Sequence, residues 1–277
     1  MPAHPVHVWW AGLADAHPGL LAVLDPVERR RYEATVGRAG RERFLVGCAL
    51  SRLALGGLLG LPPGDVPLRR LCPRCGGPHG KVRLDLPPGG PHSARPGLDF
   101  SVAHSGAVIG VAVCENARVG LDVEEADIAL DLDPAARVAL ADSELAALYG
   151  RPPAERKPAF LCTWTRKEAV LKALGVGLAV PLRGLELSRP EQPPSVLAWP
   201  EQLDERPDLS LTDLLVDEVH PAAVAVAPVR ARAGVGTEEA VGVTGAPAGV
   251  GITVRDGSAA LAEYVRSATA TGILPGG

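Results

Sequence analysis

The sequence of this protein contains no long hydrophobic run. Apolar stretches such as residues 107–114 fall far short of the roughly 20 residues that span a bilayer as a helix. The N-terminal segment MPAHPVHVWW also lacks the basic region followed by an apolar region that marks a secretory signal. Because both signs of a membrane or secreted protein are missing, we expect a cytoplasmic location and no membrane partner.

Positive charge is not in excess either. The formal net charge is −4 and the pI is near 6.0, whereas a nucleic-acid-binding domain usually has a strongly basic face. We therefore expect no nucleic-acid partner. Cysteine is scarce, at five residues, and thiols in the cytosol stay reduced. Hydrophobic residues make up 47% of the 277, which is enough for a substantial core in one large domain or two small ones.

Periodicity along the chain predicts both helices and strands. Two helices are expected within residues 26–60, and two more at 134–149 and 155–174. Three closely spaced apolar segments predict strands, and their short connections favour antiparallel pairing. These three segments are residues 98–103, 107–114 and 118–124. Further short strands are expected at residues 7–13, 184–188, 196–199, 209–216 and 222–226.

The composition changes after Val229, where Ala, Gly, Val and Thr dominate and aromatic residues are few. Such a segment offers little apolar periodicity with which to dock. We therefore expect residues 229–277 to form a mostly disordered tail, with a candidate helix at 259–267. The body before this tail is predicted to be α+β, in two parts that meet between residues 114 and 120.

The first chemical signal is the segment VGLDVEE, which ends at Glu125. On a strand, Asp122 and Glu124 point to the same face, while Leu121 and Val123 point into the core. Two neighbouring carboxylates repel each other and favour a cation between them, and Mg²⁺ is the usual hard ion beside phosphates. A strand end that runs into solvent would show the same pattern, so the segment alone leaves both interpretations open.

The second signal is FLCTWTRKEAVLKAL, residues 160–174. Leu161, Trp164, Glu168 and Leu171 fall at helical spacing on one stripe, which places a carboxylate within an apolar face. A carboxylate in that position must be paired, protonated or bound to a metal. Lys172 lies one turn on, so a simple ion pair on the helix surface is the alternative.

The third signal is FSVAHSG, in which a strand delivers His104 to a tight turn at Ser105 and Gly106. Backbone N–H groups at such a turn, together with an imidazole, suit an anionic oxygen. A histidine that only makes structural hydrogen bonds is the alternative here.

In order and spacing, the three motifs resemble those of the 4'-phosphopantetheinyl transferases, specifically the larger, pseudo-dimeric type of secondary metabolism. That family has a Phe-led strand ending in Ser-His-Ser-Gly, a Gly-(Ile/Leu/Val)-Asp-(Ile/Val)-Glu strand and a Trp-(Ser/Thr)-x-Lys-Glu-(Ala/Ser)-x-x-Lys helix. FSVAHSG, VGLDVEEAD and WTRKEAVLKALG correspond to them here. HGK, ending at Lys81, is similar to the family's Gly-Lys-Pro element, although Val82 replaces the proline. Ala103 stands where the family often has serine. The resemblance covers residues 1–228.

The resemblance implies an activity and an architecture. The activity is transfer of 4'-phosphopantetheine from coenzyme A to a serine of an apo acyl or peptidyl carrier protein, with release of adenosine 3',5'-bisphosphate. The architecture is two similar α/β halves related by a pseudo-twofold axis, with the active site at their interface, in a protein expected to be monomeric. Residues 1–115 would grip the nucleotide of coenzyme A, and residues 116–228 would carry the metal-binding carboxylates.

The resemblance also implies roles for single residues. Asp122, Glu124 and Glu168 would hold Mg²⁺ against the pyrophosphate. Glu168 is also the candidate base for the serine hydroxyl, directly or through a metal-bound water. Basic side chains would bind the donor: Lys172 and Lys167 at the pyrophosphate, His104 at the 3'-phosphate, and Arg43, Arg31 and Lys81 at the nucleotide end.

Two other interpretations stay open. A different Mg²⁺-dependent phosphohydrolase or phosphotransferase could use the same three carboxylates, with water as the acceptor in the hydrolase. A non-enzymatic zinc or protein-binding module could instead be centred on Cys72 and Cys75, because CPRC resembles half of a zinc knuckle and His79 could be a third ligand. No second pair of this kind follows, so a plain Gly/Pro-rich loop is the alternative to structural zinc.

Overall fold

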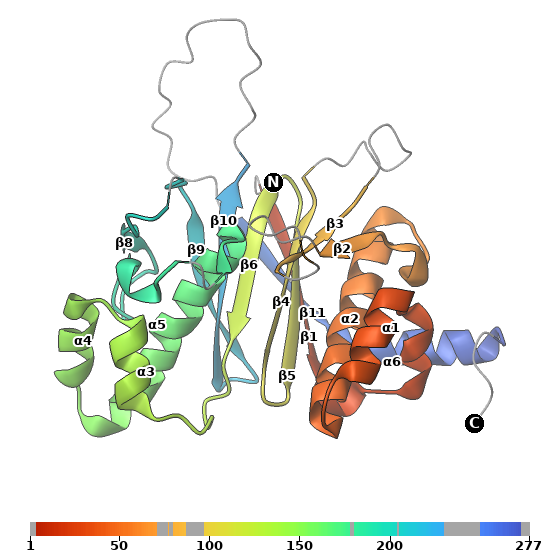
Figure 1. Cartoon of the computed structure of the whole chain (residues 1–277), viewed down its shortest axis with the longest axis horizontal. Coiled ribbons are helices and arrows are strands. Elements are labelled where there is room, and N and C mark those ends of the chain that lie inside the picture. The colour runs from red at the N-terminus through yellow and green to blue at the C-terminus, as the bar shows by residue number, and fades with distance from the viewer. Residues whose placement is uncertain are drawn as a thin grey trace, which may run out of the picture.

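The computed structural model describes residues 4–70, 77, 80–86, 97–177, 180–203, 205–229 and 250–272, and within them the fold is α+β. Figure 1 shows two groups of helices on either side of central strands. The helices are α1 (Pro26–Ala34), α2 (Arg38–Leu59), α3 (Leu132–Ala139), α4 (Asp142–Tyr149), α5 (Pro153–Leu174) and α6 (Gly257–Ala270). The strands are β1 (His4–Gly12), β2 (Leu68–Arg70), β3 (Val82–Leu84), β4 (Asp99–Ser105), β5 (Val108–Cys114), β6 (Ala117–Val123), β7 (Glu186–Leu187), β8 (Val196–Ala198), β9 (Ser210–Val216), β10 (His220–Pro228) and β11 (Val250–Asp256).

The N-terminal half is built on a four-stranded sheet in the order β11-β1-β5-β4. β5 pairs antiparallel with both β1 and β4. Helix α2 covers one face of this sheet, with the fully or almost fully buried Leu45, Leu50 and Leu55 in a core that includes Phe100 and Ile109. The burial of these side chains fixes how α2 sits on the strands that carry the FSVAHSG motif.

The C-terminal half is built on a three-stranded antiparallel sheet in the order β6-β10-β9. Helix α5 packs on β6 and β10, and the approach is closest at Gly120. A β-carbon built at Gly120 would lie 1.9 Å from the carbonyl oxygen of Ala169, so only glycine permits this contact. The glycine of the VGLDVE motif therefore brings α5 against the strand that carries Asp122.

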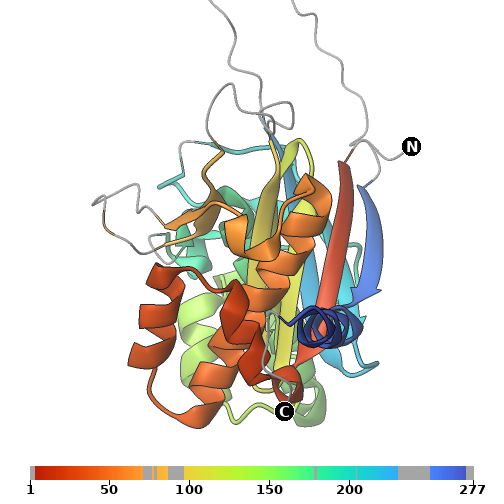
Figure 2. The same cartoon turned by 90° about the vertical axis from the view of Figure 1, so that its right-hand side faces the viewer.

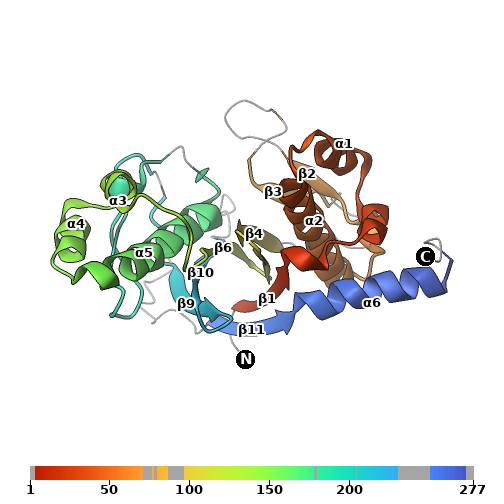
Figure 3. The same cartoon turned by 90° about the horizontal axis from the view of Figure 1, so that it is seen from below.

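The two sheets meet where β4 lies beside β6, as the view from below shows (Figure 3). The strands share no backbone ladder. Instead, Asp99 Oδ2 accepts a hydrogen bond from the Val119 amide at 2.8 Å, and Ser101 Oγ accepts one from the Leu121 amide at 3.0 Å. We call this row of contacts from β4 side chains to β6 the seam. Its successive contacts advance in the same direction along both strands.

The expected disordered tail is wrong for residues 250–272. Strand β11 pairs in parallel with β1 along its whole length, and α6 then packs on α2 with Leu261 buried (Figure 2). The backbone of β11 gains strand partners on β1, which a sheet edge supplies whatever the composition of the added strand. The candidate helix at 259–267 is confirmed as part of α6.

Two other expectations need correction. Residues 134–149 do not form one helix, because Leu140 is extended and Glu144 accepts a hydrogen bond from the Ala141 amide, which starts α4 anew. Antiparallel pairing of β4 with β5 is confirmed, but β6 does not join them and pairs antiparallel with β10 instead. The pseudo-twofold relation stays a prediction. In its favour, the 22-residue helices α2 and α5 each bury one arginine, Arg52 and Arg166, against loop carbonyl groups.

Among the helices that the structure describes, none combines the length and the apolar character needed to cross a membrane.

Candidate active site

Three carboxylates approach one another where β6 meets α5. Asp122 is 6% exposed, and burial raises its pKa to about 7, with Glu124 and Glu168 adding repulsion. The pKa of Glu168 is also raised, first by burial and then by Glu124, while Lys172 lowers it. These mutual effects show that the three predicted acids form one electrostatic group.

Lys172 neutralises part of this charge. Its Nζ lies 2.6 Å from Asp122 Oδ1 and donates a second hydrogen bond to the Leu121 carbonyl oxygen at 3.1 Å. No ion pair joins Lys172 to Glu168 within the described parts of the chain. The simple pair along the helix surface is therefore not what the structure shows, because the partner of Lys172 comes from β6.

The donor types of this group fit a hard cation, although its present arrangement does not form a finished metal site. Asp122 Oδ2 is buried without any hydrogen-bond partner, which is costly unless another group occupies that side. Across the described residues, no three His, Cys, Asp or Glu side chains are gathered closely enough to hold a metal as they stand. Side chains of the acid group would have to move for all three carboxylates to bind one ion.

The N-terminal half contributes basic groups to the same junction. Arg43, on α2, donates from Nε and Nη2 to the carbonyl oxygen of Gly106, at 3.1 and 2.9 Å. The ring of His104 stands at the end of β4, and its pKa is lowered by partial shielding from water and by the charges of Arg43 and Lys172. His104 therefore lies within electrostatic reach of both halves.

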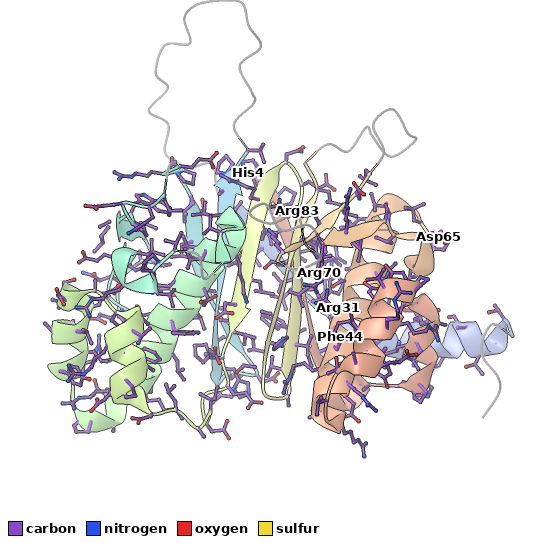
Figure 4. All side chains as sticks on the ribbon, in the orientation of Figure 1. His4, Arg31, Phe44, Asp65, Arg70 and Arg83 are labelled. Carbon is purple, nitrogen blue, oxygen red and sulfur yellow. The ribbon has the colours of Figure 1, made fainter. Side chains whose placement is uncertain are left out.

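Arg31, another basic residue expected at the donor, also belongs to the N-terminal half. Figure 4 shows Arg31 on α1, Phe44 on α2 and Arg70 on β2 on the inner side of this half, near the central strands. The pKa of Arg70 is lowered by burial and by the charge of Arg31. Two guanidinium groups that repel each other beside an aromatic ring suit an anionic, ring-bearing ligand. Arg70 was missed because it lies in a short strand with no recognisable motif.

The structure places Lys81 at the seam, and its expected role at the nucleotide stays a prediction. Its Nζ binds Asp99 Oδ2 at 2.5 Å and the Val119 carbonyl oxygen at 2.9 Å. The lysine is thus engaged at the seam, where it and Asp99 tie β4 to β6. In this arrangement Lys81 helps to join the two halves.

The structure also does not bring Lys167 to the acid group. Its side chain is 0% exposed, and Nζ contacts Glu144 Oε2 at 2.5 Å and the carbonyl oxygens of Ala139 and Leu182. Lys167 and Glu168 are neighbours on α5, but consecutive helical residues point about 100° apart. Lys167 therefore fixes α5 against α3 and α4, with its side chain fully buried.

A pocket of about 240 Å³ opens elsewhere, between α4 and the β7–β8 hairpin. None of the acid group, His104 or Arg43 lines it. Part of its polar rim is internally paired, as between Ser143 and Glu186, so the chemistry of this protein is better placed at the junction.

The sequence interpretation missed two residues beside His104. Ser105 Oγ donates to Glu124 Oε2 at 2.6 Å, and Glu125 Oε1 accepts from the Ala107 amide at 2.5 Å. Glu125 adjoins the acid motif in sequence, but nothing in a single sequence shows that β6 ends beside the turn at Gly106.

The candidate zinc ligands Cys72, Cys75 and His79 lie outside the described residues.

Comparison with known proteins agrees with the geometry. The family model of the 4'-phosphopantetheinyl transferase superfamily matches residues 118–226, which include β6, α5 and all three acids. The 4'-phosphopantetheinyl transferase HetI of Nostoc sp. strain PCC 7120 is 31% identical over 225 residues, covering 80% of this chain and 87% of HetI.

A solved structure shows a partial likeness. The crystal structure of Thermotoga maritima holo-[acyl-carrier-protein] synthase, AcpS, matches with 22% identity and a TM-score of 0.32. The match covers 40% of this chain and 63% of that one, so less than two thirds of AcpS is spanned. The identity and coverage shared with HetI decide the family on their own. This chain belongs to the 4'-phosphopantetheinyl transferase superfamily and is a transferase.

Proposed function

We propose that this protein transfers 4'-phosphopantetheine from coenzyme A to a serine hydroxyl of an apo acyl or peptidyl carrier protein and releases adenosine 3',5'-bisphosphate. One observation carries the proposal: His104 of the N-terminal half lies within electrostatic reach of Lys172 of the C-terminal half, beside three carboxylates. A donor with a pyrophosphate and a separate 3'-phosphate needs basic groups at two places and a metal at one.

We further propose that Asp122, Glu124 and Glu168 hold Mg²⁺. The orphaned Oδ2 of buried Asp122 supports this assignment, as does the preference of Mg²⁺ for carboxylate ligands beside phosphates. When bound, the ion would neutralise charge on the pyrophosphate. Lys172 supplies a second positive charge there, because its side chain is 29% exposed and remains open to a ligand.

Glu168 is our candidate base. Burial raises its pKa toward neutrality, and a base with a pKa nearer the working pH accepts a proton more effectively. The serine hydroxyl gives its proton to Glu168, and the serine oxygen bonds to the phosphorus that carries pantetheine. The bond from that phosphorus to the bridging oxygen breaks, and the electron pair leaves with adenosine 3',5'-bisphosphate.

The N-terminal half then orients the donor. His104 and Arg43 would meet the 3'-phosphate, and Arg31, Arg70 and Phe44 would meet the rest of the nucleotide. Each contact is proposed from the position of a basic or aromatic side chain on the inner side of that half. A cytoplasmic location and a monomeric state stay predictions.

The test is a reconstituted transfer. The protein is incubated with coenzyme A, Mg²⁺ and an apo carrier protein, and intact mass spectrometry follows addition of the phosphopantetheine arm to the carrier. Excess EDTA should stop the reaction and added Mg²⁺ or Mn²⁺ restore it, since hard ions suit oxygen ligands. Breakdown of coenzyme A with no modified carrier would instead establish a hydrolase, and full activity in EDTA would remove the metal from the proposal.

A further inference from the structure

We propose that Glu125 is a positioning residue for the donor site, because it clamps the turn that joins the phosphate-binding side to the acid group. This proposal rests on the proposed function of His104 and Arg43 as donor-binding residues. Glu125 directly follows Glu124 after the end of β6, and its carboxylate turns back onto residues 105–107. We call those three residues the His104 turn.

Glu125 contacts the His104 turn in two ways. Its Oε1 accepts a hydrogen bond from the Ala107 amide at 2.5 Å. Its carboxyl carbon lies so close to Gly106 that a β-carbon built there would stand only 1.8 Å away. Gly106 also has φ of +50°, a left-handed conformation that glycine adopts most easily. The carboxylate therefore fills the space that any side chain at position 106 would need.

The opposite side of the turn is held by Arg43. Its guanidinium donates twice to the Gly106 carbonyl oxygen. A third contact comes from Ser105, whose Oγ binds Glu124 Oε2 at 2.6 Å. The His104 turn is thus fixed by Arg43 of the N-terminal half and by two adjacent acids of the C-terminal half.

The negative charge of Glu125 does not itself attract the donor. A carboxylate beside a site for phosphate repels the ligand, so by charge alone its removal would improve binding. Its hydrogen bond, however, holds the amide of Ala107 and thereby the carbonyl on which Arg43 is anchored. If positioning dominates, loss of the acceptor weakens donor binding even though a repulsive charge disappears.

Three substitutions separate these effects. Glu125→Ala removes the acceptor and the charge, Glu125→Gln keeps an acceptor without the charge, and Asp127→Ala removes a charge from an exposed position two residues on. The probe is adenosine 3',5'-bisphosphate, with its Kd measured by calorimetry. We expect Glu125→Ala to weaken binding about tenfold, the usual scale for a hydrogen bond to a charged group. Glu125→Gln and Asp127→Ala should stay within about twofold of the parent.

Steady-state kinetics give a second readout. In transfer assays, Glu125→Ala should raise the KM for coenzyme A much more than it lowers kcat, because the acid group is untouched. A merely structural role would change the amount of folded enzyme, and so the apparent kcat, without changing KM. Equal Kd and KM in Glu125→Ala and the parent would overturn the proposal.

The close approach to Gly106 allows a double-mutant cycle. Gly106→Ala should weaken donor binding strongly in the parent, because the new methyl group meets the Glu125 carboxylate. In the Glu125→Ala background the same change should cost clearly less, since only the backbone strain remains. Equal costs in both backgrounds would show that Glu125 does not clamp the turn. A parent enzyme that binds the probe but modifies no carrier protein would refute the proposed function and leave the clamp intact.

Discussion

Replacement of Lys172 by methionine tests the central ion pair of the site. The Lys172 ammonium lies 2.6 Å from Asp122 Oδ1, and the two side chains are 29% and 9% exposed. The substitution keeps most of the apolar stem of the lysine but leaves Asp122 without a cation. Because the other oxygen of Asp122 is already unpartnered, the whole carboxylate would then lack compensation.

The size of the effect follows from burial and from the pKa of Asp122. Breaking a fully buried pair costs about 3–5 kcal/mol, but Lys172 is partly exposed and Asp122 can take up a proton. We therefore expect a loss of about 1–2 kcal/mol in the free energy of unfolding at pH 8.5. At pH 5.5 the loss should nearly vanish, because Asp122, whose pKa is raised to about 7, is already protonated in the parent.

The sign follows from proton linkage. A folded-state pKa above the unfolded value means that stability is greatest below the unfolded pKa and is lost as pH rises through the folded pKa. Lys172→Met removes the charge that lowers the pKa of Asp122, so the variant should lose more stability than the parent on going from pH 5.5 to pH 8.5.

Urea unfolding at the two pH values is the assay, with an unchanged m-value required for the comparison. Lys157→Met serves as the matched control, because Lys157 lies on the same helix outside the site. Equal losses at both pH values, or no loss at pH 8.5, would refute the ion pair described here.

Three further predictions follow from the site and the fold. Glu168→Gln should lower kcat by about 100-fold or more at saturating substrates while Kd for adenosine 3',5'-bisphosphate changes little, so a variant that turns over like the parent would remove Glu168 from catalysis. The pKa of His104 is lowered in the free protein and a bound phosphate would raise it, so donor affinity should fall as pH rises through neutrality, and calorimetry should find this slope missing in His104→Gln. A chain ending at Val229 loses β11 and α6, which leaves the β1 edge and Leu261's site on α2 uncovered, so its melting temperature should fall by several degrees; an unchanged melting temperature would show that these elements contribute no stability.

The acid group was predictable because the sequence patterns that indicate it each lie within one strand or one helix. Alternation along VGLDVE places Asp122 and Glu124 on one face of a strand, and the structure buries Leu121 and Val123 on the other. Helical spacing places Glu168 toward the same junction. A period of two and a period of 3.6 each need only a few neighbouring residues, so a single sequence suffices.

The partners of charged residues were not predictable in the same way. An i, i+4 rule favours Glu168 as the partner of Lys172, whereas the structure pairs Lys172 with Asp122, 50 residues away. Lys167 shows the same limit, because its neighbour Glu144 comes from α4. Coulomb energy depends on distance in space, and a sequence gives that distance only for residues within one element.

The tail was misjudged for a related reason. The expectation of disorder rested on composition, which measures how much apolar surface a segment can bury on its own. β11 gains its order from an existing sheet edge, because its backbone pairs with β1. The paired residues are far apart in sequence: His4 and Val250, for example, are 246 residues apart. Composition carries no information about such an edge.

At the seam, a local strand pattern and long-range side-chain contacts together position the candidate site. The sequence of β4 predicts a strand but not its neighbour. Asp99, Ser101 and Ser105 lie on the same face of β4, and their side chains bond to β6 or to Glu124, which follows it. Because no backbone ladder joins the two sheets within the described residues, these side chains and Lys81 help set the offset between β4 and β6. That offset decides how far His104 stands from Glu124. A shift of one residue along the seam would exchange the faces of the strand and separate His104 from the acid group. The polar side chains of Asp99, Ser101 and Ser105 thus help to hold His104 beside the acid group.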